Sequence, residues 1–301
     1  MSSERPLGGD QGTTGSPPPG TAAADLRVEV TFGGKTHPGK VRQNNEDHFL
    51  VTRLAKIMQV CMSSLPENGS RLFSEEVGYL MVVADGMGGA AAGEKASALA
   101  ISTVEDFALN TLKWFFRLGN DEEHALLSEL RSGIERADRA VIDRARSDPR
   151  LHGMGTTLTM AYSVATDLYL VHAGDTRAYL FHDGLIQQMT NDHTLVQMLV
   201  NHGALTPEDA KHHKRRNVVT NVVGGPATGV HAEVHKIRVA DGDVLLLCSD
   251  GLTEVVSDDE IARVLGSQSE PQTACEALIE RALAGGGPDN VTAIVARYKF
   301  G

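Results

Sequence analysis

Five aspartates stand where apolar, strand-like segments of the sequence begin or end. Asp85 closes the run VVAD, Asp250 closes VLLLCSD, and Asp175 directly follows LYLVHAG. Asp47, in RQNNEDHF, and Asp289, in GPDNVTAIVA, each precede such a segment. A carboxylate at the end of a buried strand is held rigidly and partly out of water. Several that converge there repel one another unless a cation lies between them.

The residue types beside these aspartates favour a hard divalent cation. Glycine follows Asp85 and Asp250 directly, and the missing side chain lets backbone carbonyls and waters approach. Oxygen ligands suit Mg²⁺ or Mn²⁺, whereas zinc prefers cysteine and histidine. The alternative for any single aspartate is a turn or a helix cap, because Asp-Gly is common turn chemistry. Spacing alone does not show that the five side chains meet.

The elements that must position these aspartates occur in blocks of strands and blocks of helices. Apolar residues recur at helical spacing over 92–118 and 121–147, which predicts two long helices. Further helices are predicted over 192–203, 258–265 and 271–284. Blocks of this kind favour an α+β fold with antiparallel sheets over a doubly wound parallel sheet. Strands are predicted over 26–31, 47–51, 57–62, 79–85, 156–165, 167–174, 177–182, 231–239, 243–250 and 290–298.

The composition of the chain limits its domain organisation, its partners and its cellular compartment. Residues 1–24 are rich in Gly, Ser, Thr, Pro and Ala without apolar periodicity, which predicts a disordered tail before one globular domain over 25–301. The net charge of −11 argues against nucleic-acid binding, which needs a basic face. We find neither a signal sequence nor an apolar run that could span a membrane, so we expect a cytoplasmic protein. Three scattered cysteines, Cys61, Cys248 and Cys275, are expected to be unreactive thiols.

Seven segments in order resemble the successive motifs of the metal-dependent Ser/Thr protein phosphatases, the PPM or type 2C family. The motif DGMGG resembles that of the bacterial branch of the family, and the resemblance extends from about residue 28 to 299. Each motif alone is weak, but seven in register are specific. They are RQNNEDHF (42–49), VVADGMGGAAAGEKAS (82–97), GMGTTLTMAY (153–162), HAGDTRAYL (172–180), TNDHTLVQMLV (190–200), CSDGLTEVV (248–256) and GPDNVTAIVARY (287–298).

The resemblance implies a four-layer αββα sandwich, in which two antiparallel sheets are flanked by helices. It also implies roles for residues that match the family's motifs. The aspartates at 47, 85, 250 and 289 and the carbonyl of Gly86 match the ligands of a binuclear metal centre, and Glu46 matches a residue that holds metal-bound waters. Asp175 matches a residue that, with Asp250, can hold a third and weaker metal in bacterial members. Arg42 matches the phosphate-binding arginine.

The implied function is hydrolysis of phosphoserine and phosphothreonine in proteins by a hydroxide that bridges two Mn²⁺ or Mg²⁺ ions. The implied partners are phosphorylated proteins, including a Ser/Thr kinase and its substrates, in signal transduction. Two alternatives stay open: a catalytically inactive relative that binds a partner, and a small-molecule phosphomonoesterase. Inactive relatives usually lose a metal aspartate, and here every such position is filled.

The sequence departs from the family pattern at Met87 and at Ala90, where bacterial members often carry a histidine, and it carries two features of its own. Met87 stands where eukaryotic members carry a histidine proposed as the general acid. Residues 63–76 have a loop composition and predict a long hairpin connection. The run KHHKRR (211–216) falls where the family has a flap beside the active site. It is either a solvated helix end or an attraction site for acidic substrate segments.

Overall fold

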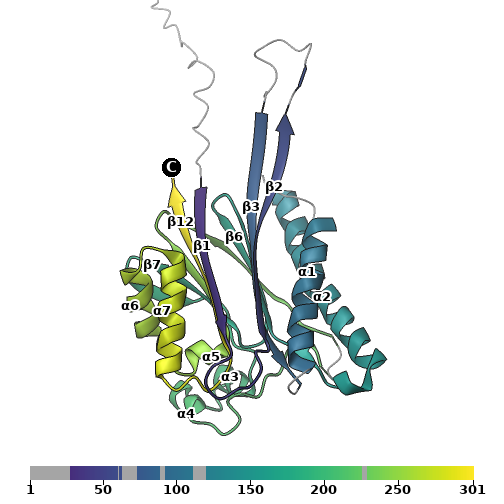
Figure 1. Cartoon of the computed structure of the whole chain (residues 1–301), viewed down its shortest axis with the longest axis vertical. Coiled ribbons are helices and arrows are strands. Elements are labelled where there is room, and N and C mark those ends of the chain that lie inside the picture. Colours follow the sequence, from purple (N-terminus) through teal and green to yellow (C-terminus); the bar gives the residue numbers. More distant parts are fainter. Residues whose placement is uncertain (1–27, 60, 63–72, 89–91, 111–119, 226–228) are drawn as a thin grey trace, which may run out of the picture.

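Two antiparallel sheets face each other in the computed structural model, which describes residues 28–59, 61–62, 73–88, 92–110, 120–225 and 229–301 (Figure 1). The predicted tail, residues 1–24, lies outside the described residues. One sheet has the order β1 (Val28–His37), β12 (Val291–Phe300), β11 (Val244–Cys248), β7 (Arg177–His182) and β8 (Leu185–Gln188). The other has the order β10 (Glu233–Arg238), β6 (Asp167–Ala173), β5 (Leu158–Val164), β3 (Phe73–Met87), β4 (Gly155–Thr156) and β9 (Val223–Gly224), and β2 (Asp47–Gln59) pairs with β3.

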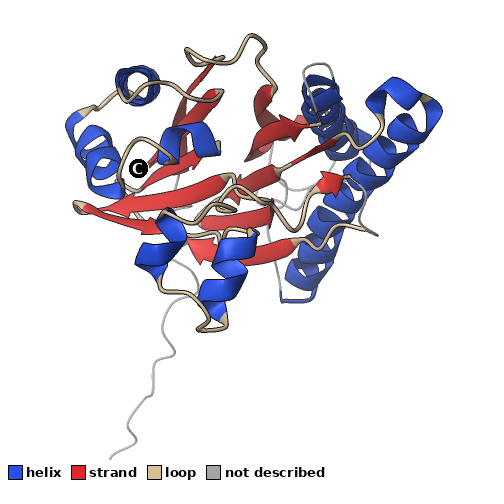
Figure 2. Cartoon of the chain, turned by 90° about the horizontal axis from the view of Figure 1, so that it is seen from below, coloured by secondary structure: helices blue, strands red, loops and turns tan. Residues whose placement is uncertain are grey.

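Helices cover the outer face of each sheet, on opposite sides of the sandwich (Figures 1 and 2). On the seven-stranded sheet lie α1 (Ala92–Asn110) and α2 (Asn120–Ser147), and on the other lie α6 (Asp258–Ser267) and α7 (Pro271–Ala284). The short helices α3 (Leu195–Asn201), α4 (Pro207–Lys211) and α5 (Asp250–Thr253) lie together at one end (Figure 1). This is the predicted α+β, four-layer αββα sandwich.

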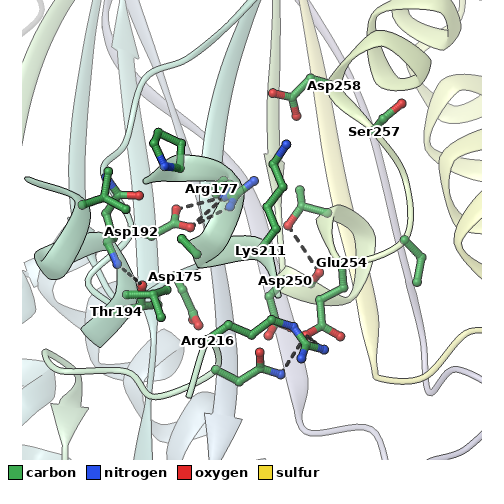
Figure 3. Close-up of a pocket in the computed structure, with 18 of the residues that line it drawn as sticks. Asp175, Arg177, Asp192, Thr194, Lys211, Arg216, Asp250, Glu254, Ser257 and Asp258 are labelled. Atoms are coloured by element: carbon green, nitrogen blue, oxygen red, sulfur yellow. Dashed lines mark hydrogen bonds and ion pairs between the residues drawn. The ribbon is translucent and has the colours of Figure 1, made fainter. Parts of the chain in front are cut away.

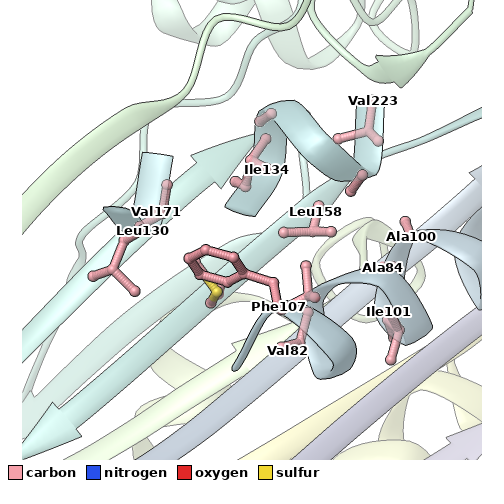
Figure 4. Close-up of a cluster of buried hydrophobic side chains, with 14 of the residues drawn as sticks. Val82, Ala84, Ala100, Ile101, Phe107, Leu130, Ile134, Leu158, Val171 and Val223 are labelled. Atoms are coloured by element: carbon pink, nitrogen blue, oxygen red, sulfur yellow. The ribbon is translucent and has the colours of Figure 1, made fainter. Parts of the chain in front are cut away.

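Three apolar clusters hold the layers together. The apolar stripes of α1 and α2 pack on the outer face of β3, β5 and β6, where Phe107, Leu130 and Ile134 are almost fully buried (Figure 4). A second cluster joins α6 and α7 to β11 and β12. The third fills the space between the sheets with side chains such as Met81 and Leu247. Burial of apolar surface is the main favourable term in folding.

The two-residue period of the strands aims the site residues into the space between the sheets. On β3, Met81 and Val83 face the other sheet, and Asp85 follows them at the same parity. On β11 the inward positions 245 and 247 lead to 249, and on β12 the inward positions 298, 296 and 294 lead to 292. The polar residues at these ends therefore continue the apolar core, at the end of the sandwich where α3 and α5 lie (Figure 1).

The structure corrects two of the predicted elements. Residues 47–51 and 57–62, predicted as two short strands, contribute to the single strand β2, which ends at Gln59. The predicted loop over 63–76 is too long, because β3 begins at Phe73; residues 63–72 lie outside the described part. The cause is long-range pairing: β2 and β3 stay in register from Asp47↔Asp85 to Gln59↔Phe73, well beyond the end of β5. The predicted helix over 92–118 is described only as far as Asn110.

Candidate metal centre

Among the aspartates predicted to bind metal, Asp47 is held in place by hydrogen bonds to its side chain. It begins β2, is 2% exposed and lies directly opposite Asp85 in the β2–β3 pairing. Its Oδ2 accepts hydrogen bonds from the hydroxyls of Ser249 (2.7 Å) and Thr292 (2.8 Å), which belong to the other sheet. Its Oδ1 is buried and has no hydrogen-bond partner. One oxygen is thus fixed in place, and the other is left to face a ligand.

Asp85 is positioned through its backbone. Its N–H donates to the hydroxyl of Thr157 (3.1 Å), and its carbonyl accepts from the Thr157 N–H (2.8 Å) and the Thr156 hydroxyl (2.7 Å). Gly86, the next residue, donates to the Glu46 carbonyl at 3.1 Å. A Cβ on Gly86 would lie 2.1 Å from the carbonyl oxygen of Gly93, so only glycine lets the start of α1 approach this closely.

Asp250 and Asp289 complete the group of four aspartates. Asp250 is the first residue of α5, and its Oδ1 is also buried without a hydrogen-bond partner. Asp289 lies just before β12, and its Oδ2 is 2.6 Å from Nη2 of Arg42. The Arg42 side chain is 56% exposed. The arginine expected to bind phosphate therefore lies at the rim of the cluster, paired with one of the predicted metal ligands.

Asn290 joins the chain segments on which Glu46 and Asp289 lie. Its Oδ1 accepts from the Glu46 N–H (2.7 Å), and its Nδ2 donates to the carbonyls of Pro38 (3.0 Å) and Asn44 (2.8 Å). The Glu46 carbonyl accepts from the Ser97 hydroxyl of α1 at 2.6 Å. The loop before β2 is thus held by main-chain and side-chain hydrogen bonds rather than by apolar packing.

Burial and mutual repulsion make these carboxylates hard to ionise. Burial raises the pKa of Asp47 to about 7 and that of Asp250 to about 6, and neighbouring carboxylates add to both shifts. Burial, and then the charges of Asp47, Asp250 and Asp175, raise the pKa of Asp85 well above its ordinary value. Asp175 is 9% exposed, and its pKa is raised well above its ordinary value by burial and by Asp250.

A cation fits this arrangement. Isolated buried carboxylates are costly, and opposite charge among them favours the ionised form. The two partnerless oxygens, on Asp47 and Asp250, belong to the same group of neighbouring carboxylates. All side chains in this group are oxygen donors, which suit Mg²⁺ or Mn²⁺. The structure thus brings the predicted aspartates together, whereas the individual roles of these residues stay a prediction.

A cleft of about 1100 Å³ opens beside Asp175 and Asp250 (Figure 3). One wall carries Lys211, His212 and Arg216 from the segment with α3 and α4, and the other carries Glu254 and residues at the start of α6. Asn217 of the first wall donates to Glu254 at 2.7 Å, and Arg216 lies 3.9 Å from it. The basic run at 211–216 therefore borders the cleft.

Sequence reasoning missed the hydroxyl residues that hold the carboxylates. Ser249 and Thr292 lie within quoted motifs, directly before Asp250 and shortly after Asp289, and their strand parity was the available signal. Cys248 was correctly expected to be inert: it is fully buried, and burial raises the pKa of its thiol to about 12. Cys275 is buried as well, and Cys61 is exposed.

Removing the Ser249 hydroxyl should weaken cation binding. In Ser249→Ala, Asp47 Oδ2 loses one of its two hydroxyl donors, so the carboxylate is held less firmly. We expect Mn²⁺ affinity, measured by titration calorimetry, to fall about tenfold or more, as is typical when a residue that orients a metal ligand is lost. Ser102→Ala, a matched change on the exposed face of α1, should bind Mn²⁺ like the unmodified chain. Equal affinities in the two variants would contradict the supporting role of Ser249.

Comparison with known families and proteins gives one consistent group. The family described as Protein phosphatase 2C matches residues 71–284. The chain is 36% identical over 274 residues to the serine/threonine protein phosphatase PstP of Mycobacterium tuberculosis, an alignment that covers 91% of this chain and 46% of PstP. It thus spans about half the length of that relative. It is 31% identical over 261 residues to the serine/threonine phosphatase stp of Listeria monocytogenes, with 87% of this chain and 93% of the relative covered.

Solved structures agree in fold. A crystal structure of the M. tuberculosis phosphatase PstP/Ppp has a TM-score of 0.71 at 36% identity and covers 90% of this chain and 99% of its own. A structure of the PstP catalytic domain in complex with two manganese ions has a TM-score of 0.69 at 34% identity, with 91% and 100% covered. Within the described residues, no helix has the length and apolar character needed to cross a membrane.

Proposed function

The chain belongs to the protein phosphatase 2C family, and from this premise we propose that it hydrolyses phosphoserine and phosphothreonine in proteins with the help of two divalent cations, Mn²⁺ or Mg²⁺. The observation that carries the proposal is the group of neighbouring carboxylates in which one oxygen of Asp47 and one of Asp250 are buried without a hydrogen-bond partner. An inactive binding relative has no need to retain so costly an arrangement. Proteins phosphorylated by a Ser/Thr kinase, in the cytoplasm, are the proposed substrates, and the kinase itself is a proposed partner.

Each residue of the cluster has a proposed task. The aspartates at 47, 85, 250 and 289 and the carbonyl of Gly86 would hold the two cations, and Glu46 would hold waters beside them. Asp175, with Asp250, would hold a third and weaker cation. When bound, such cations would neutralise the charge of the phosphoryl group and lower the pKa of coordinated water, so that no protein nucleophile is required. Consistent with this, the buried Cys248 thiol has a pKa raised to about 12.

Arg42 is proposed to bind the substrate phosphate. Its side chain is more than half exposed, and its Nη2 donates a hydrogen bond to Asp289. A planar guanidinium presents several N–H donors that match two phosphate oxygens. A cation at Asp289 would compete for the carboxylate that Arg42 now contacts. The arginine would then be free to pair with the phosphate.

The cleft supports a protein substrate over a small metabolite. Its volume of about 1100 Å³ lies at the upper end of the range of about 300–1000 Å³ typical of small-molecule pockets, so volume alone does not separate the two substrate classes. It extends from Asp175 and Asp250 past Arg216 and Asp258, so residues that flank a phosphorylated serine or threonine can lie in it (Figure 3). Both walls carry charged side chains beside apolar ones such as Val200 and Val255, a mixture that suits contact with an exposed peptide segment.

Phosphate release from a phosphothreonine peptide tests the proposal. We expect release with Mn²⁺, none above background in EDTA, and full recovery when Mn²⁺ is added in excess of the chelator, because the metal supplies the nucleophile. Release from p-nitrophenyl phosphate and sugar phosphates, but not from the peptide, would favour the small-molecule alternative. No release from any substrate at any Mn²⁺ concentration would favour the inactive relative and refute the proposal.

A further inference from the structure

His193, in the motif TNDHTLV, is hydrogen-bonded to both backbone polar groups of Gly174. The His193 backbone N–H donates to the Gly174 carbonyl at 2.7 Å, and the His193 ring Nδ1 accepts from the Gly174 N–H at 3.1 Å. Gly174 is the residue directly before Asp175. The Gly174 carbonyl lies in the same planar peptide as the Cα of Asp175, and the two backbone torsions of Gly174 separate its N–H from that peptide.

Gly174 is confined on its other side by Thr157. Its φ is +121°, a conformation that favours glycine, and a Cβ placed there would lie 2.4 Å from the Cβ of Thr157. Thr157 is the residue whose N–H and hydroxyl hold the Asp85 peptide. The Gly174 backbone thus lies between the support of Asp85 and the ring of His193.

His193 also holds the far end of the segment that borders the cleft. Its carbonyl accepts from the N–H (2.7 Å) and the hydroxyl (2.9 Å) of Thr220, and its Nδ1 lies 2.9 Å from Nδ2 of Asn221. Both ends of the segment 194–220, which includes α3 and α4, therefore lie at this histidine. One residue fixes both the cleft-bordering segment and the turn that carries Asp175.

The ring's other nitrogen faces an acid. His193 Nε2 lies 3.3 Å from Oε2 of Glu233, and Glu233 Oε1 lies 2.6 Å from Nε2 of His235. The ring of His172 is stacked beside His193, with 4.8 Å between ring centroids. His172, His193 and Glu233 together have the composition of a metal site.

Hydrogen bonding argues against a metal between these three side chains. His193 Nδ1 accepts from the Gly174 N–H, so the proton of the neutral ring lies on Nε2. In His172, Nε2 is bonded to the Asn191 carbonyl, a pure acceptor, so its proton also lies on Nε2. Nε2 of each ring therefore carries a proton and has no lone pair with which to bind a cation shared with Glu233. The cluster is therefore a hydrogen-bond network behind Asp175.

We propose that His193 is a positioning residue for Asp175, which acts by accepting the Gly174 N–H through Nδ1. The inference rests on the proposed function, because it concerns the third and weaker cation that Asp175 and Asp250 would bind. Glu233 Oε2 lies 3.3 Å from Nε2 without a hydrogen bond, whereas Nδ1 accepts the Gly174 N–H. Loss of that acceptor leaves the buried side of the turn with only the bond from the His193 N–H to the Gly174 carbonyl, so the torsions of Gly174 and the position of Asp175 are held less firmly.

Two substitutions separate the two nitrogens of the ring. In His193→Asn, the amide oxygen takes the place of Nδ1 and can still accept from Gly174, but the side chain no longer reaches Glu233. In His193→Gln, the longer amide reaches toward Glu233 and leaves no acceptor at the Nδ1 position. Glu233→Gln removes the acid while it leaves His193 intact. Asp175→Asn identifies which Mn²⁺-binding event belongs to Asp175.

The measurement is calorimetric titration of the full chain with Mn²⁺, together with thermal unfolding of each variant. We expect the weakest binding event, absent in Asp175→Asn, to weaken about tenfold or more in His193→Gln and to change less than about threefold in His193→Asn and Glu233→Gln. The two tighter events should persist in all four variants, which shows that the fold is kept. Should His193→Gln fail to fold, His193→Ala, which removes both ring nitrogens, takes its place beside His193→Asn and should weaken the same event about tenfold or more; an unchanged event in His193→Ala would overturn the proposal.

Three outcomes are informative in different ways. Equal losses in His193→Asn and His193→Gln, or a loss in Asn alone, would overturn the proposal. An unchanged weak event in His193→Gln would overturn it too, while tight Mn²⁺ binding and phosphate release would leave the proposed function intact. A wild-type chain that binds no Mn²⁺ would instead refute the proposed function itself, and the inference about His193 with it.

Discussion

Asp85→Asn is expected to reduce Mn²⁺-dependent phosphate release from a phosphothreonine peptide by at least about a thousandfold. A charge-assisted metal contribution of several kcal/mol is lost with the carboxylate, and about 4 kcal/mol corresponds to a factor of a thousand in rate. The fold should be retained, because the backbone groups of residue 85 keep their hydrogen bonds to Thr156 and Thr157. Turnover is measured as kcat at saturating Mn²⁺.

The matched control for this prediction is Asp183→Asn. Asp183 has an exposed side chain in the turn between β7 and β8 and a positive φ of +46°, which asparagine adopts as readily as aspartate. We expect its activity to equal that of the unmodified chain. Circular dichroism of both variants checks the fold. Near-normal turnover by a folded Asp85→Asn protein would show that the site has been assigned to the wrong carboxylates.

In EDTA, the unmodified chain is expected to lose stability as the pH rises from 5 to 8. The pKa of Asp47 is about 7 in the folded protein, against about 3.9 in an unfolded chain. Since the folded pKa is the higher one, the stabilising contribution is complete below about pH 4 and is lost as the pH rises to about 7. Between pH 5 and 8 the loss for this group alone is about 3 kcal/mol. It corresponds to a fall in Tm on the order of 10 °C.

Asp47→Asn isolates this effect from all other titrating groups. Its amide is uncharged, and its side-chain oxygen can still accept from Ser249 and Thr292. In EDTA, the Tm of this variant should therefore fall much less between pH 5 and 8 than that of the unmodified chain. Excess Mn²⁺ at pH 8 should raise the Tm of the unmodified chain, because a ligand that binds only the folded state stabilises it. A wild-type Tm that is flat or rising with pH in EDTA would contradict the interpretation.

Local patterns were enough to predict the longer helices and most of the strands, but not the short helices α4 and α5. The stripe from Leu126 to Val141 belongs to α2, and α7 has the predicted limits, Pro271–Ala284. Sequence patterns failed where pairing partners decide the outcome. The polar residues between Val51 and Ile57 break the apolar pattern of β2, yet the strand continues because β3 runs beside it for its whole length.

The site divides in the same way. The carboxylates could be predicted because they lie in motifs, whereas their supports depend on contacts across the fold. Ser249 is 202 positions from Asp47 and Thr292 is 245 positions away, so no local pattern links them. The Arg42–Asp289 pair, 247 positions apart, is another such case. His193 lies within the motif TNDHTLVQMLV, but its proposed role follows only from its hydrogen bonds to Gly174.

The support of Asp47 crosses from one sheet to the other. Asp47 belongs to β2, while the hydroxyls that hold its Oδ2 come from the end of β11 and from β12. A small sliding of one sheet against the other would therefore separate the carboxylate from its donors. Packing defects deep in the sandwich, such as a truncated Met81 or Leu247, can then alter cation affinity from a distance. Conversely, a bound cation would act as a crosslink that resists shear between the layers.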